Sequence, residues 1–144
     1  MRCAVVLGFT VALLAGCAGG TSGADRMANI SLEGSPNEST VGPVDPDSAS
    51  ITIPLGGRVI IGGFRGRGCG APAPDFQAFM EEQVDDGLRV PDGIVLYDAG
   101  IGQYNSGRCK GRVAARAIGA RAEAAGSYRL RFFGGEVTKT VTVE

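Results

Sequence analysis

Short segments rich in β-branched and aromatic residues recur from residue 48 to the end of this 144-residue chain, and turn-forming residues separate them. Two of the turns are explicit, with Pro-Asp-Gly at 91–93 and Gly-Gly-Glu at 134–136. Strands of this spacing are typical of a small all-β domain. The pattern therefore predicts a mainly β fold, a small antiparallel sandwich, with six strands at residues 50–53, 58–61, 94–97, 111–118, 128–133 and 137–143.

One segment departs from this pattern. Asp75 is a residue type that caps helices, and the apolar residues at 76, 79, 80 and 84 recur at helical spacing. We therefore expect one short helix near 75–84, although Phe76, Ala78 and Met80 would also fit one face of a strand. The alanine-rich run 114–125 could be partly helical as well, but Gly119 in its middle disfavours a helix.

The N-terminus begins with a basic residue and continues with an apolar run over residues 4–15. A membrane-spanning helix needs about 20 such residues, so this run fits the apolar part of a signal peptide instead. It ends in Leu14-Ala15-Gly16-Cys17, which resembles the lipobox of bacterial lipoproteins at all four positions. The resemblance implies cleavage before Cys17 and lipid attachment to its thiol and its new amino group. An ordinary secretory signal, cut near residue 18 or 20, and a retained anchor are the alternatives.

This resemblance divides the chain into a cleaved leader at 1–16, the lipidated Cys17 with a flexible tether to residue 47, and a folded domain at 48–144. The tether prediction rests on scattered glycine- and proline-containing dipeptides among few apolar residues. Two or more acyl chains hold a protein stably on a bilayer, so we expect a cell-envelope protein anchored on a membrane. By the same resemblance, Ala18 in place of Asp favours the outer membrane where the source has one.

Four cysteines are present, and two remain for the folded domain once Cys3 leaves with the leader and Cys17 carries lipid. Cys69 and Cys109 are an even pair in an exported domain, which predicts a disulfide because the compartment is oxidising. The bond would close a loop of about 40 residues and stabilise the domain by roughly 4 kcal/mol. A redox-active or metal-binding pair is the alternative, although C-x-x-C spacing and histidine are both missing.

A second and weaker resemblance lies near the C-terminus. Residues 126–130, Gly-Ser-Tyr-Arg-Leu, resemble the approach to strand F of immunoglobulin-like domains, where a tyrosine, here Tyr128, anchors the corner. The residues up to 143 would then form strand G, and residues 50–64 would form strands A and B. The chain departs from antibody domains because it has no tryptophan and because its two cysteines do not stand at the B and F positions. The resemblance implies a bacterial immunoglobulin-like sandwich.

Composition excludes several functions. The chain has no histidine, which removes serine–histidine and cysteine–histidine catalysis and every histidine-ligated metal site. The formal net charge of −1 disfavours a nucleic-acid partner, because nucleic-acid binders are usually strongly basic. We expect no metal site and no cofactor.

The most unusual stretch is Gly-Gly-Phe-Arg-Gly-Arg-Gly-Cys-Gly at 62–70. A glycine-rich loop after a strand can bind an anion through its backbone amides, and Arg65 and Arg67 would then be the side-chain contacts. The stretch lacks both the Gly-Lys-Ser/Thr of P-loops and the G-x-G-x-x-G of dinucleotide sites. We favour the alternative of a tight loop that brings Cys69 to its partner.

Charge is unevenly distributed along the chain. Residues 75–98 carry seven carboxylates and one arginine, whereas residues 108–131 carry seven cations and one glutamate. If 111–118 and 128–133 share a sheet, one face of that sheet presents four arginines, whose planar guanidinium groups suit phosphate and carboxylate. These candidates for an anion-binding face are Arg112, Arg116, Arg129 and Arg131. A solvated sheet face is the alternative, and it is the one we favour.

Together these features predict a lipid-anchored envelope protein whose domain binds or scaffolds and does not catalyse. The expected partners are the membrane, through the anchor, and an envelope protein, a lipid head group or a wall polymer. Two alternatives stay open. One is a small envelope hydrolase that uses a pair of carboxylates, and the other is a carrier of a small molecule or ion.

Overall fold

The computed structural model describes residues 26–32, 39–43 and 49–144 of the chain. The predicted leader at 1–16 and the predicted lipid attachment at Cys17 lie outside these residues. The elements in chain order are β1 (Ile30–Ser31), β2 (Ser39–Pro43), β3 (Ser50–Ile53), β4 (Arg58–Arg65), α2 (Phe76–Asp85), β5 (Ile94–Ser106), β6 (Gly111–Ala122), β7 (Gly126–Phe132), the 3-10 turn η1 (Phe133–Gly135) and β8 (Val137–Val143).

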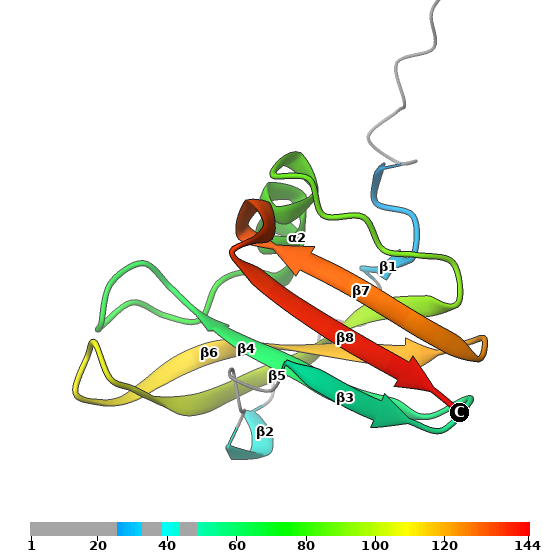
Figure 1. Cartoon of the computed structure of the whole chain (residues 1–144). Coiled ribbons are helices and arrows are strands. Elements are labelled where there is room, and N and C mark those ends of the chain that lie inside the picture. The colour runs from blue at the N-terminus through cyan, green and yellow to red at the C-terminus, as the bar shows by residue number, and fades with distance from the viewer. Residues whose placement is uncertain (1–25, 33–38, 44–48) are drawn as a thin grey trace, which may run out of the picture.

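The strands form two sheets, and α2 lies at one end of the space between them (Figure 1). The first sheet has the order β1-β5-β6-β4, with β2 also paired to β5, and the second has the order β3-β8-β7. The prediction of a mainly β, sandwich-like domain with one short helix is confirmed. Its strands are not all antiparallel, because β1 and β2 pair with β5 in parallel and β3 pairs with β8 in parallel. The pairs β4–β6, β5–β6 and β7–β8 are antiparallel.

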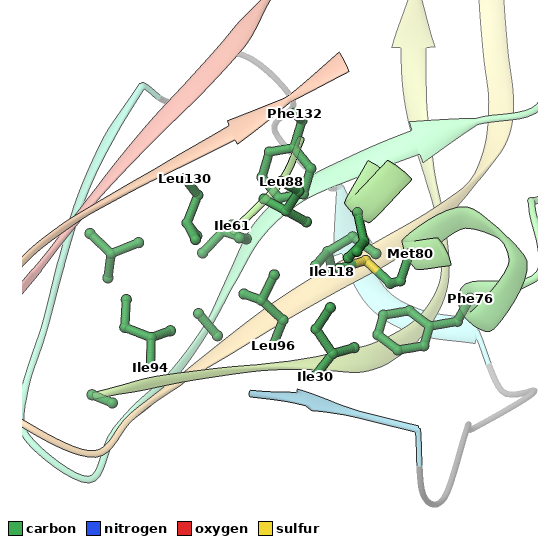
Figure 2. Close-up of a cluster of buried hydrophobic side chains, with 14 of the residues drawn as sticks. Ile30, Ile61, Phe76, Met80, Leu88, Ile94, Leu96, Ile118, Leu130 and Phe132 are labelled. Carbon is green, nitrogen blue, oxygen red and sulfur yellow. The ribbon is translucent and has the colours of Figure 1, made fainter. Parts of the chain in front are cut away.

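The hydrophobic core lies between the two sheets and under α2 (Figure 2). Alternate residues of β5 are buried from Ile94 onward, as expected of a strand with one face on a core. The second sheet contributes Leu130 and Phe132 from β7, both fully buried. The helix adds the apolar residues that recur at helical spacing in the sequence. The apolar faces of the strands and of the helix therefore share one core. The helical contribution consists of Phe76, Phe79, Met80 and Val84.

The predicted helix near 75–84 is present, and local sequence explains both of its ends. Asp75 is extended and its carboxylate accepts a hydrogen bond from the amide of Ala78 at 2.9 Å, which caps the N-terminus. At the other end Gly87 has φ +102°, and the amide of Leu88 donates to the carbonyl of Gln83 at 2.8 Å. This is the Schellman arrangement, for which glycine is the preferred residue.

The alanine-rich run is a strand and not a helix. Gly119 explains why this part of β6 tolerates a bulky neighbour, because a Cβ at this position would overlap the ring of Tyr97 on β5. The guanidinium carbon of Arg58 lies 5.4 Å from the centre of the same ring, a cation–π arrangement. The ring of Tyr97 on β5 therefore lies over Gly119 on β6 and beside Arg58 on β4, so the contact spans three neighbouring strands of the first sheet.

Part of the segment predicted as a tether, residues 26–32, contacts the domain. Ile30 on β1 is 9% exposed and belongs to the core. Arg26 forms an ion pair with Asp85 of α2 at 3.1 Å. Asn29 donates its side-chain amide to Asp92 at 2.9 Å. Sparse apolar residues concealed this docking, because backbone pairing with β5 provides much of the attachment.

Tyr128 lies at the start of β7, where the sequence suggested a corner tyrosine. Its hydroxyl donates to the carbonyls of Ala124 at 2.9 Å and Ala125 at 3.3 Å, a few residues upstream. Tying a strand start to the preceding turn in this way is the physical role of a corner tyrosine. The relationship to immunoglobulin-like domains stays a prediction.

Candidate functional site

Four phenylalanines gather where β4, α2 and the β7–η1 junction meet. Phe64 stacks on Phe79 with ring centres 4.9 Å apart, and its ring centre lies 5.3 Å from that of Phe132 and 5.5 Å from that of Phe133. Offset and edge-to-face arrangements at these separations are favourable beyond simple burial. Phe132 is fully buried, whereas Phe133 is 37% exposed, so the cluster runs from the core to the surface.

Phe133 has a strained backbone. Its φ is +51°, in the left-handed region that bulky residues rarely occupy. Its amide donates to the side-chain carbonyl of Gln83 at 2.7 Å, and Gln83 is only 1% exposed. The side-chain amide nitrogen of Gln83 has no hydrogen-bond partner within the part of the chain that the structure describes. The buried Gln83 therefore uses its side-chain carbonyl oxygen to bind the backbone of Phe133, whose φ is unfavourable for a bulky residue.

An open pocket of about 540 Å³ lies beside this aromatic cluster, and we call it the arginine pocket. Strand β4 and the loop after it form one wall, β5 and the turn after it form another, and η1 with the start of β8 completes it. Its described lining combines guanidinium groups, aromatic rings and glycines. The lining residues are Gly63, Phe64, Arg65, Gly66, Arg67, Tyr104, Arg108, Phe133 and Val137.

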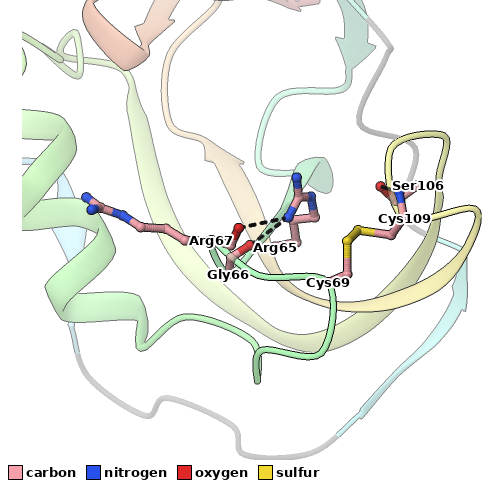
Figure 3. Close-up of a disulfide and its surroundings, with 6 residues drawn as sticks. All are labelled: Arg65, Gly66, Arg67, Cys69, Ser106 and Cys109. Carbon is pink, nitrogen blue, oxygen red and sulfur yellow. Dashed lines mark hydrogen bonds between the residues drawn. A yellow bond between two sulfur atoms is a disulfide. The ribbon is translucent and has the colours of Figure 1, made fainter.

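Arg65 is positioned by its own loop (Figure 3). Its Nη1 donates to the carbonyl of Gly66 at 3.0 Å and contacts the carbonyl of Arg67 at 3.5 Å. The side chain is therefore fixed through one end of the guanidinium. The edge formed by Nε and Nη2, which binds carboxylate or phosphate in a bidentate manner, is not used in these bonds.

The other two arginines of the pocket differ from Arg65. Arg67 is 94% exposed at its side chain and forms an ion pair with Glu82 of α2 at 3.1 Å, which compensates its charge. Arg108 lies in the exposed turn between β5 and β6, and no ion pair or hydrogen bond of its side chain is found among the residues described. Arg65 and Arg108 are thus the cations that the pocket offers to a ligand.

The predicted disulfide between Cys69 and Cys109 is present (Figure 3). It joins the loop that follows β4 to the turn that follows β5, and those two segments carry Arg67 and Arg108. The amide of Cys109 also donates to the hydroxyl of Ser106 at 3.2 Å. The bond therefore ties together two walls of the arginine pocket. The tight-loop interpretation of 62–70 and the anion-contact interpretation of Arg65 and Arg67 are compatible.

The predicted face of four arginines does not form. Strand β6 carries Arg112 and Arg116 in the first sheet, whereas β7 carries Arg129 and Arg131 in the second, so the shared sheet on which the prediction depended is absent. Arg116 is also buried, at 6% exposure. Alternation along each strand was predicted correctly, but the sheet to which each strand belongs cannot be read from alternation.

Arg116 has a structural partner that the sequence did not reveal. Its Nη1 lies 3.2 Å from a carboxylate oxygen of Asp98 on β5, and the two side chains are 7% and 2% exposed. Its Nε donates to the carbonyl of Pro74 at 2.9 Å, just before α2. Asp98 also accepts from the amide of Gly100 at 2.8 Å, next to an irregularity in the β5–β6 register. This buried pair connects the first sheet to the segment that begins α2.

Neither a metal centre nor a membrane span stands out in the described ranges. No group of three or more cysteine, aspartate and glutamate side chains is arranged to hold a metal ion among those residues. In the same ranges no helix has the length and apolar character needed to cross a bilayer. The chain matches no protein-family model, no curated protein and no solved structure. The chemistry of the arginine pocket is therefore the basis for a functional proposal.

Proposed function

We propose that this protein is a membrane-anchored lipoprotein of the cell envelope, whose β-rich domain binds a ligand or partner and does not transform it. The sequence Leu14-Ala15-Gly16-Cys17 after a short apolar run supports the anchor. The disulfide between Cys69 and Cys109 supports an oxidising compartment, since such bonds persist mainly outside the cytoplasm. Both features favour the envelope, and Ala18 favours the outer membrane where the source has one.

The arginine pocket is the observation that carries the binding role. Its described polar groups are mainly guanidinium donors, whose planar geometry suits carboxylate and phosphate. Its apolar groups are aromatic rings held in a defined arrangement by the Phe64–Phe79 stack and by Gln83. A rigid surface that presents fixed donors and exposed rings suits recognition. The envelope offers anionic proteins, lipid head groups and wall polymers as partners.

An immunoglobulin-like sandwich is the architecture we propose for the domain. Two packed sheets and the hydroxyl bonds of Tyr128 support it. Sandwiches of this kind present loops at their ends while the sheets hold them rigid, and loops on rigid scaffolds are where binding residues concentrate. The loop after β4 and the turn after β5, which the disulfide joins, fit this description.

The intact mass of the protein, purified from the membrane fraction of its own host, tests the anchor and the compartment together. We expect a mass that fits the chain from Cys17 onward plus acyl groups, and a gain of two hydrogen atoms on reduction. Cys17→Ser is the matched control, and it should lose the acyl mass and accumulate as an unprocessed chain. A mass that retains Met1, or one without lipid, would contradict the proposal.

A further inference from the structure

The lining of the arginine pocket combines charged and aromatic side chains. One side offers the guanidinium groups of Arg65 and Arg108, and the other offers the rings of Phe64 and Phe133. A volume of about 540 Å³ lies within the range of roughly 300–1,000 Å³ that is typical of small-molecule sites. The size and the lining therefore indicate a small ligand that is partly charged and partly apolar.

The charged side is prepared for an oxyanion. Two loop carbonyls hold Nη1 of Arg65 and leave its Nε–Nη2 edge outside those bonds. A guanidinium fixed in this way loses little conformational freedom when it binds a carboxylate or phosphate. Arg108 also lines the pocket, from the β5–β6 turn, which the disulfide attaches to the same loop. Glu82 compensates only Arg67, so the pocket keeps positive charge.

The apolar side shows the backbone strain that functional sites often store. Phe133 keeps φ +51° although glycine or asparagine would adopt it more easily. In this conformation its amide donates to Gln83, and its 37%-exposed ring lies beside Phe64 at the pocket. The ring packs edge-on against Phe79 with ring centres 5.9 Å apart, and its exposed part is accessible to a ligand.

We propose that the arginine pocket binds a small organic anion in which a carboxylate or phosphate group is attached to an apolar ring or chain. Arg65 and Arg108 bind the oxyanion, and Phe64 and Phe133 pack against the apolar part. The inference rests on the binding role proposed above and names the chemical class of the ligand. It does not depend on the lipid anchor. The mass measurement decides the anchor and a titration decides the pocket, so each can fail without the other.

Isothermal titration calorimetry on the oxidised protein as purified, with phosphatidylcholine nanodiscs present whether or not the protein carries lipid, tests the ligand class. The probes are phenyl phosphate and phenylacetate, with inorganic phosphate and benzyl alcohol as controls that each keep one half of the chemistry. We expect both aromatic anions to bind at least about tenfold more tightly than either control, since each half adds its own interaction free energy. Equal affinity for phenyl phosphate and benzyl alcohol would overturn the proposal.

Variants locate the binding. Arg108→Gln changes an exposed turn residue and should weaken phenyl phosphate binding about tenfold or more, because it removes a charge-assisted contact. Arg129→Gln is the matched control, since this exposed arginine on β7 lies outside the pocket lining, and it should leave the affinity unchanged. Thermal unfolding of both variants verifies that they fold. Equal affinities of the two variants would refute the assignment to this pocket.

The same oxyanion chemistry occurs in soluble metabolites and in phospholipid head groups. Nanodiscs that contain phosphatidylglycerol distinguish these sources. Loss of phenyl phosphate binding in those discs would identify a lipid head group as the competitor that occupies the pocket. Unchanged binding would identify a soluble anion as the source. Both results retain the proposed pocket chemistry, whereas absence of phenyl phosphate binding in phosphatidylcholine discs would remove it.

Discussion

Removing the disulfide by the double substitution Cys69→Ser and Cys109→Ser should destabilise the domain more than any single surface change. The bond joins residues 40 positions apart. Closing a loop of that length lowers the entropy of the unfolded chain by about 13 cal/mol/K, which corresponds to about 4 kcal/mol at 25 °C. A small domain is usually stable by about 5–15 kcal/mol in total. The double variant should therefore remain folded with a much smaller margin.

The loss should appear in two measurements. In urea unfolding, the free energy of unfolding should fall by about 4 kcal/mol, and the midpoint of thermal unfolding should fall by about 15 to 30 °C for a domain of this size. Phenyl phosphate binding should weaken as well, because the bond attaches the loop that follows Arg65 to the turn with Arg108. Reduced wild-type protein should behave like the double variant.

Ser106→Ala is the control for a local disturbance of the same turn. It removes only the hydrogen bond from the amide of Cys109, and it should lower the free energy of unfolding by about 1 kcal/mol. If the double cysteine variant is no less stable than Ser106→Ala, the loop-closure argument is wrong. If the double variant is much less stable but binds phenyl phosphate normally, the bond stabilises the fold and does not organise the pocket.

Three further predictions follow from single contacts. Arg116→Met should lower the free energy of unfolding in urea by about 3–5 kcal/mol, because it removes one partner of a buried ion pair. Adding Asp98→Leu should recover only part of that loss, because Asp98 also accepts a hydrogen bond from the amide of Gly100. Equal stabilities of the single and double variants would contradict this. Gly119→Ala should lower the free energy of unfolding by about 1–3 kcal/mol, because the new Cβ overlaps the ring of Tyr97. Thermal unfolding measures this loss, and a smaller loss in a Tyr97→Ala background would verify the cause. Lys110→Gly should stabilise the protein by about 1 kcal/mol, since φ at this position is +53°, and a lower unfolding midpoint would refute the strain.

The sequence was informative wherever a local pattern decides the structure. Alternation marked β7 and β8, and the apolar spacing after Asp75 marked α2 together with its cap. The counting of cysteines identified the Cys69–Cys109 pair, because the predicted leader and lipid attachment leave only those two for the domain. Each of these features depends on residues close in sequence or on a short list of possible partners.

Longer-range features could not be predicted. Strand β5 extends to Ser106, well beyond the predicted end at 97. The glycine and polar residues in this part have low strand propensity, so the sequence pattern did not mark them as a strand. Backbone pairing with β6 holds them in the sheet. Strands β1 and β2 pair with β5 through backbone groups, which side-chain composition does not report. The face that each arginine occupies depends on sheet assignment, so Arg112 and Arg129 were grouped incorrectly.

Part of the candidate site could be predicted from the sequence. Arg65 and Arg67 could be singled out because two arginines among glycines are unusual, and both line the pocket. Tyr104, Arg108 and Phe133 could not, since they come from distant segments that only the fold brings together. The one local signal for Arg108 was its position next to Cys109, because a disulfide brings the neighbours of both cysteines together.

The docking of β1 sets how far the domain can stand from a bilayer. Arg26 forms an ion pair with Asp85 of α2, and Ile30 is part of the core, so the first described residues already contact the domain. With the proposed anchor at Cys17, eight residues separate it from Arg26, and this stretch spans about 30 Å at full extension. A free segment to residue 47 would reach about 100 Å by the same measure. If Cys17 carries lipid as proposed, this short connection would keep the domain within about one molecular diameter of the membrane surface, so its partners would lie on that surface or project from it.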